Sequence, residues 1–377
     1  MFEGLSVAMV TPFKNGAVDR EATARLVDHM IDGGVQGLVV SGSTGEAATC
    51  TVEERRELWA FVRDRAKKRA WVVAGTGTNN TADSIALTRM AEELGLDGAM
   101  VVTPYYNKPT PKGQAAHFAA VAKSTKLPLI LYNVPGRTGT NTTPDVLAMV
   151  HDLPNVKAVK EASGNVDQMA QVKTRTKLTL LSGDDSLTLA CAAVGGEGIV
   201  SVVGQAAPKP MRALIDLARA GRMNDALQAH QKLMPLFRAA FIESNPGPIK
   251  YLLAQMGLIA NELRLPLVPI EPATEKAVLE AARAVGLPLA SGAAAGVGAA
   301  GRSACCASSS WARQGAWAGP SRPRPWPRAT WRSRRGWTCA RIFPRATGYG
   351  VQRLLRCSRA ATWSWSSAVR GARAMRR

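Results

Sequence analysis

Cysteine and histidine are scarce in the first 300 residues of this sequence. Of the six cysteines only Cys50 and Cys191 lie there, and neither belongs to a CxxC pair. Two isolated cysteines are typical of a reducing compartment and exclude a disulfide framework. The four histidines all fall in segments with helical periodicity or at their ends. We therefore expect neither a metal site nor histidine-based catalysis.

Long hydrophobic runs are also missing. No apolar stretch approaches the roughly 18 residues that a membrane span needs, because glycine or polar residues interrupt each one. The N-terminal segment MFEGLSVAMVTPFK has an acidic residue at position 3 and no basic segment before an apolar run, unlike a signal peptide. We expect a cytoplasmic protein without a transmembrane helix.

Acidic side chains and lysine are absent after Glu280. Seventeen of the 48 basic residues are arginines beyond residue 300, so residues 1–300 carry 31 basic against 28 acidic side chains. The net charge of +20 therefore belongs mainly to the C-terminal end, where seven of the nine tryptophans also lie. We interpret residues 291–377 as a disordered, low-complexity basic tail, similar to a GC-rich reading frame translated out of register.

A nucleic-acid-binding arm is the alternative interpretation of this tail, with the preceding residues as a scaffold. Arginine can neutralise phosphate and aromatic side chains can stack on bases. No pattern of a nucleic-acid-binding module accompanies them, so we expect no nucleic-acid partner. Removing residues 292–377 and measuring binding and activity separately would decide between the two interpretations.

Eight short apolar segments alternate with longer amphipathic ones. They are residues 5–10, 37–40, 71–75, 98–102, 127–132, 155–160, 178–182 and 198–203. Strands that are apolar on both faces, each followed by a helix, favour a closed parallel barrel over a doubly wound open sheet. We expect an α/β protein with a (β/α)8 TIM barrel at 1–222.

Helical periodicity continues after the eighth strand. It is present in residues 208–219, 224–240, 247–257 and 272–286, which is more than one closing helix requires. We therefore expect a small C-terminal helical layer at 223–290, ahead of the tail.

Polar residues gather where the predicted strands end, which is where barrels of this kind place their reacting groups. The glycines of residues 42–46 permit a tight turn whose amides and hydroxyls can hold a small carboxylate. Tyr105, Tyr106 and Tyr132 with Arg137 are expected to converge on one rim, where phenols relay protons and a guanidinium grips a carboxylate. Taken singly, each of these tyrosines and the glycine-rich turn also fit a purely structural role.

Lys160 ends the sixth predicted strand. Because strand side chains alternate, Val156, Ala158 and Lys160 are expected on one face, with the lysine in the barrel mouth. A lysine among apolar neighbours loses proton affinity, and its neutral amine can attack a ketone to form an imine. A strand-terminal lysine is more often a surface residue, so its neighbours must support this hypothesis.

Six segments together carry a resemblance to a known family. They are GSTGE at 42–46, TPYYNKP at 103–109, YNVPGRTG at 132–139, KEASGN at 160–165, SGDD at 182–185 and ESNPGPIK at 243–250. Over roughly residues 1–290 the sequence resembles the dihydrodipicolinate synthase family of pyruvate-dependent aldolases, whose superfamily includes N-acetylneuraminate lyase.

The resemblance implies a lyase that uses no cofactor, since Lys160 itself forms an imine with pyruvate. Tyr132 moves protons during this step, and Ser43 and Thr44 hold the pyruvate carboxylate. Ser43 stands where many family members have threonine, but the hydroxyl is kept. The implied second substrate is aspartate 4-semialdehyde, and the implied product is 4-hydroxy-tetrahydrodipicolinate in lysine and diaminopimelate biosynthesis.

Four further residues take roles through the resemblance. Tyr106, contributed by a neighbouring subunit, forms a proton relay with Ser43 and Tyr132, which implies a homotetramer built as a dimer of dimers. Arg137 binds the carboxylate of the aldehyde. The backbone carbonyls of Gly183 and Val200 line the site.

Some relatives are inhibited by lysine at a dimer interface. The corresponding positions here are Ala47, Val52, Arg55, Asn79, Asp83 and Tyr105. Asn79 and Tyr105 fit the sensitive pattern, whereas Val52 and Arg55 replace histidines and Ala47 lacks a hydroxyl. We predict weak or absent inhibition by lysine.

Two alternatives to this function are a sister lyase and a barrel without catalytic activity. A sister lyase acting on sialic acid or a sugar-derived keto acid would keep Lys160 and Tyr132, but Arg137 and Tyr106 argue against it. A catalytically silent barrel has no support, because every reacting group that the family needs is present.

Overall fold

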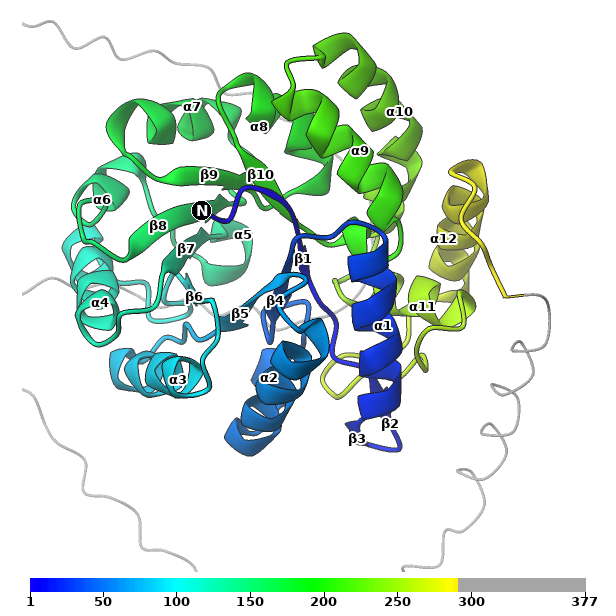
Figure 1. Ribbon diagram of the computed structural model, residues 1–377, viewed down its shortest axis with the longest axis horizontal. Coiled ribbons are helices and arrows are strands. Elements are labelled where there is room, and N and C mark those ends of the chain that lie inside the picture. Colours follow the sequence, from blue (N-terminus) through cyan, green and yellow to red (C-terminus); the bar gives the residue numbers. More distant parts are fainter. Residues whose placement is uncertain (291–377) are drawn as a thin grey trace, which may run out of the picture. The chain divides into compact units, whose positions relative to one another are not determined.

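A closed barrel of eight parallel strands forms the centre of the computed structural model, which describes residues 1–290 (Figure 1). Around the barrel the strands are β1 (Gly4–Ala8), β10 (Gly198–Ser201), β9 (Thr179–Ser182), β8 (Val156–Glu161), β7 (Leu129–Asn133), β6 (Gly98–Val102), β5 (Trp71–Gly75) and β4 (Gly37–Val40). β1 pairs with both β10 and β4, which closes the barrel and rules out the open sheet. The predicted (β/α)8 fold is confirmed, and each predicted apolar segment overlaps one strand.

Helices surround the strands (Figure 1). They are α1 (Arg20–Asp32), α2 (Val52–Ala66), α3 (Thr81–Glu93), α4 (Pro111–Lys123), α5 (Pro135–Thr138), α6 (Pro144–Ala148), α7 (Val166–Arg175), α8 (Thr188–Ala193) and α9 (Pro208–Arg219). Short 3-10 helices occupy Ala47–Thr49, Asp185–Leu187 and Val203–Gln205. Local sequence sets the helix starts: the Asp19 side chain caps α1, and Thr51 with Glu54 forms a capping box on α2. The hairpin of β2 (Phe13–Lys14) and β3 (Ala17–Val18) is an element that the apolar pattern does not predict.

Three more helices form the C-terminal layer: α10 (Met223–Ala239), α11 (Gly247–Gln255) and α12 (Pro272–Ala284). Their ends agree with the predicted helices within two residues. α10 packs on α9, and α12 packs on α10 and α11. Residues 1–290 fall within one compact unit, so the division at residue 222 remains a prediction, and the predicted tail lies outside the described residues. No helix among residues 1–290 has the length and apolarity to span a bilayer.

The core has two layers that follow the alternation of strand side chains. Ile130, Ala158 and Leu181 fill the barrel interior, whereas Leu131 and Val159 pack between strands and helices. Ala158 and Lys160 therefore share the inner face, as predicted.

Val156 was expected on the same inner face, and this is wrong. It packs in the outer layer, because the pairing of β7 with β8 shifts between Leu129 and Ile130 and passes over Lys157. An extra residue in one strand reverses the facing of the side chains before it.

Candidate active site

The carboxyl ends of β4, β7, β8 and β9 surround a cavity of about 60 Å³, here called the lysine cavity. Its lining includes Ser43, Thr44, Tyr132, Arg137, Lys160, Gly183, Asp184 and Asn245. A larger adjoining cavity of about 420 Å³ shares Ser43, Tyr132, Arg137 and Asn245 with it. Six of the eight predicted catalytic and substrate-binding residues thus line one space.

Lys160 is buried at the end of β8, with only 4% of its surface exposed. Its Nζ lies 4.2 Å from the centroid of the Tyr132 ring. Burial lowers the pKa of Lys160 to about 8 and Arg137 acts in the same direction, although the charges of Asp184 and Asp185 act to raise it. A substantial fraction of the amine is therefore neutral near pH 8, and a neutral amine is a nucleophile.

Tyr132 stands beside Lys160 because the two residues are paired in the register of β7 and β8. Burial raises the pKa of Tyr132 to about 12, and the Ser43 side chain acts in the opposite direction. The phenol therefore keeps its proton at neutral pH. A protonated phenol next to a neutral amine can donate a proton to an oxygen that leaves the carbon under attack.

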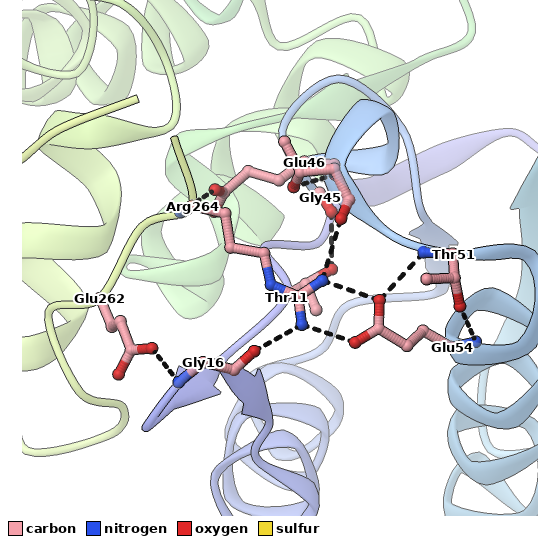
Figure 2. A network of polar contacts seen from close by, with 9 residues as sticks. Thr11, Gly16, Gly45, Glu46, Thr51, Glu54, Glu262 and Arg264 are labelled. Carbon is pink, nitrogen blue, oxygen red and sulfur yellow. Dashed lines mark hydrogen bonds and ion pairs between the residues drawn. The ribbon is translucent and has the colours of Figure 1, made fainter. Parts of the chain in front are cut away.

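The turn at residues 42–46 is held by side chains from distant segments. Thr11 Oγ1 donates to the carbonyl of Gly45 at 2.7 Å, and the backbone amide of Arg264 donates to Glu46 Oε2 at 3.0 Å (Figure 2). Glu46 adopts a left-handed conformation with φ of 51°, and its buried carboxylate forms an ion pair with Lys250 of α11. These contacts fix the backbone that carries Ser43 and Thr44.

Arg264 connects the same network to α2 and to the β2–β3 hairpin (Figure 2). Its Nη1 and Nη2 donate to the two Glu54 oxygens at 2.7 and 2.5 Å, and Nη2 also donates to the carbonyl of Gly16 at 2.7 Å. The Gly16 amide in turn donates to Glu262 at 2.6 Å. The segment after α11 is thereby tied to α2 and to the β2–β3 hairpin, so the C-terminal layer supports the site.

Asn245 connects two of the predicted substrate-binding residues. Its Nδ2 donates to Thr44 Oγ1 at 2.8 Å, and its backbone carbonyl accepts from Arg137 Nη2 at 3.2 Å. No role is predicted for Asn245 from the sequence, although it lies in the segment 243–250. Its distance of 201 positions from Thr44 explains why no local pattern could assign it.

Asp184 is a second residue to which the sequence assigned no role. It lines the lysine cavity, and burial raises the pKa of its carboxyl while Lys160 acts to lower it. The segment SGDD was the available signal, but it does not say which aspartate faces the cavity. Asp185 points away from it and accepts hydrogen bonds from Ser201 and from the Val202 amide.

Comparison with known proteins places this geometry in a family. The family model described as the dihydrodipicolinate synthetase family matches residues 1–285 of the sequence. The chain belongs to this family. The 4-hydroxy-tetrahydrodipicolinate synthase of Persephonella marina is 43% identical over 291 residues, which are 76% of this chain and 99% of the relative.

Solved structures of the family agree with the fold. The dihydrodipicolinate synthase of Thermotoga maritima is 41% identical, with a TM-score of 0.75 over 76% of this chain and 100% of the other. A structure described as a monomeric dihydrodipicolinate synthase variant is also 41% identical, with a TM-score of 0.75 over 76% of this chain and 98% of the other.

Gly183 and Val200 differ in how they relate to the lysine cavity. A Cβ on Gly183 would lie 2.5 Å from the Ala162 Cβ and 3.1 Å from the Lys160 Cε, so this position needs glycine. Val200 is fully buried in the barrel interior, and Val202 is the residue after β10 that lines the cavity. The role of the Val200 carbonyl remains a prediction.

The expectation that three tyrosines converge on one rim is wrong within a single chain. Tyr132 lines both cavities and Tyr105 lines the larger one, but Tyr106 lines neither and is 88% exposed. Tyr106 has φ of 70°, and its amide donates to the carbonyl of Thr138 at 3.3 Å. This backbone leaves the phenol in solvent.

Only some of the predicted lysine-effector positions lie at the larger cavity. Ala47, Arg55 and Tyr105 line the larger cavity, whereas Val52, Asn79 and Asp83 do not. The Arg55 guanidinium donates to the Ala47 carbonyl, and burial lowers the pKa of Arg55. A cation thus occupies the wall of this space.

Proposed function

We propose that this chain condenses pyruvate with L-aspartate 4-semialdehyde to give 4-hydroxy-tetrahydrodipicolinate, a step of lysine and diaminopimelate biosynthesis in the cytoplasm. The observation that carries the proposal is a buried lysine of lowered pKa, 4.2 Å from a tyrosine ring, in a cavity that also contains an arginine. The name of the Persephonella marina relative supports the same reaction.

The first step is the formation of an imine on Lys160. The neutral Nζ attacks the ketone carbon of pyruvate, a nitrogen–carbon bond forms, and the ketone oxygen leaves as water after taking up protons. Tyr132 supplies a proton to that oxygen. The hydroxyls of Ser43 and Thr44 hold the pyruvate carboxylate, with Thr44 oriented by Asn245.

The second step forms the carbon–carbon bond. Loss of a methyl proton converts the imine to an enamine, whose carbon attacks the aldehyde while the aldehyde oxygen takes up a proton. Arg137 grips the carboxylate of the aldehyde substrate. The amino group of that substrate then displaces Lys160 at the imine carbon, which closes the ring and frees the enzyme. The imine nitrogen accepts the electrons, so the proposal uses no cofactor.

The assembly proposed with this function is a homotetramer, a dimer of dimers in which Tyr106 completes the proton relay of a neighbouring subunit. The 88% exposure of Tyr106 supports a role outside its own chain. Inhibition by lysine is expected to be weak or absent, because Arg55 places a positive charge in the larger cavity, where a cationic effector would lie.

Trapping with borohydride tests the mechanism. The chain is incubated with pyruvate, reduced, digested and mapped by mass spectrometry, with Lys160→Ala as the control. An adduct on Lys160 that the control lacks is the expected result. An adduct on no lysine would exclude the imine mechanism, and one that persists in Lys160→Ala would exclude Lys160 as the reacting amine. A parallel assay with aspartate 4-semialdehyde and N-acetylmannosamine identifies the aldehyde.

A further inference from the structure

A buried polar cluster lies behind Lys160 and Tyr132, on the outer face of the same two strands. Asn133 pairs with Glu161 in the strand register, directly after the pair of Tyr132 with Lys160. Because strand side chains alternate, Asn133 and Glu161 point away from the cavity, toward the helices. Glu161 is completely buried and Asn133 is 1% exposed.

The Glu161 carboxylate is surrounded by hydrogen-bond donors. It accepts from Asn133 Nδ2 at 3.0 and 3.1 Å, from Gln168 Nε2 of α7 at 3.0 Å and from the Ser163 amide at 2.8 Å. No ion pair to Glu161 occurs among residues 1–290. Burial raises the pKa of Glu161, while these hydrogen bonds act to lower it. A buried carboxylate without a cation is costly, and an apolar pair would avoid that cost, so the cluster points to a role beyond packing.

Asn133 connects this carboxylate to the segment after α5, the helix that carries Arg137. Its Nδ2 also donates to Asn141 Oδ1 at 2.7 Å, and its Oδ1 accepts from the Thr142 amide at 2.8 Å. Asn141 donates to Gln168 at 2.8 Å, which closes a ring of hydrogen bonds. The ends of β7 and β8 and the segment after α5 are thus held by one cluster.

The same cluster reaches the end of β6. The hydroxyls of Thr142 and Thr103 lie 2.7 Å apart, and Thr103 Oγ1 donates to the backbone carbonyl of Tyr132 at 3.0 Å. The backbone of Tyr132 is therefore fixed on two sides.

We propose that Glu161 and Asn133 are positioning residues that set the separation between the Lys160 amine and the Tyr132 phenol. The inference rests on the proposed imine chemistry. Each positioning residue follows its reacting residue directly in the chain, so a shift of the pair moves both reacting groups. A misplacement of about 1 Å can lower a rate about a hundredfold.

Glu161→Gln is the first variant. Its volume is unchanged, but its amide group brings at least one N–H against the N–H of Asn133, Gln168 or Ser163. We expect the rate of imine formation at saturating pyruvate, measured by rapid quenching with borohydride, to fall about tenfold or more. The thermal midpoint is measured on the same samples.

Two further variants separate positioning from stability. Thr88→Val removes a buried hydrogen bond of 2.8 Å to Thr76, away from Lys160, and is expected to lower the thermal midpoint with an unchanged rate. Asn133→Asp with Glu161→Gln exchanges carboxylate and amide, keeps one of each in the pair, and is expected to restore most of the rate.

The outcomes are distinct. An unchanged rate in Glu161→Gln overturns the inference, as does an exchanged variant that recovers its thermal midpoint but stays tenfold slow. If Glu161→Gln does not fold, the rate of the exchanged variant decides alone. A wild-type chain that gives no adduct on Lys160 overturns both this inference and the proposed function.

Discussion

Two lysines are buried among residues 1–290, and they have opposite surroundings. Lys250 is completely buried, forms an ion pair with Glu46, donates to the carbonyl of Glu262 at 2.7 Å and lies 4.3 Å from the centroid of the Phe13 ring. Lys160 is 4% exposed and has no ion pair among the residues that the structure describes.

Burial alone therefore does not make a lysine a nucleophile. Burial lowers the pKa of both lysines, but for Lys250 the hydrogen-bonded carboxylate of Glu46 acts to raise it. The same carboxylate forms an ion pair with the Lys250 ammonium group. Asp184 and Asp185 act on the pKa of Lys160 only through their charges, so its amine stays free to react. The paired lysine supports the fold, and the unpaired one is left for chemistry.

Lys160→Arg should give the largest effect. Arginine keeps the positive charge but cannot supply a neutral amine, so we expect condensation to fall by at least about a thousandfold. The assay is product formation from pyruvate and aspartate 4-semialdehyde. Activity within tenfold of wild type would show that the wrong lysine of the two has been assigned.

Lys250→Met should affect stability. It leaves the buried Glu46 carboxylate without its cation, which costs about 3–5 kcal/mol in comparable pairs. Denaturant unfolding measures the change, and adding Glu46→Gln should recover much of it. Lys160 should still take the borohydride-trapped adduct in the folded fraction. Unchanged unfolding in Lys250→Met would contradict the structural role of this pair.

The pH dependence of imine formation should report Lys160. Only the neutral amine attacks, and a pKa of about 8 means that the neutral fraction grows as pH rises through that value. The rate at saturating pyruvate should increase about fivefold from pH 7 to pH 8 and about twofold more above it. A rate that still climbs steeply beyond pH 9 would indicate an amine of ordinary pKa.

Asp184→Asn should have the smallest effect. Its carboxylate acts to raise the pKa of Lys160, so removing the charge should move the midpoint of the same pH profile to lower pH. Asp152→Asn is the matched control, because Asp152 forms an exposed ion pair with Lys177 at 3.1 Å and should leave the midpoint in place. A midpoint that moves upward in Asp184→Asn would contradict this electrostatic assignment.

Much of the molecule was predictable from the sequence, because the relevant signals are local. Apolar segments locate every barrel strand, and the capping box of Thr51 and Glu54 locates the start of α2. The alternation of side chains puts Lys160 on the inner face with Ala158. It fails for Val156, because a register shift depends on the neighbouring strand and leaves no trace in the segment itself.

The barrel and the residues able to react follow from the amino-acid sequence alone, since periodicity and side-chain chemistry are properties of short segments. Which of these groups meet depends on the tertiary structure. Barrel closure and packing of the C-terminal layer bring Asn245 to Thr44, Glu46 to Lys250 and Arg264 to Glu54 across some 200 positions or more. These contacts decide which buried lysine is paired and which is free, because burial and charge depend on neighbours in space rather than along the chain.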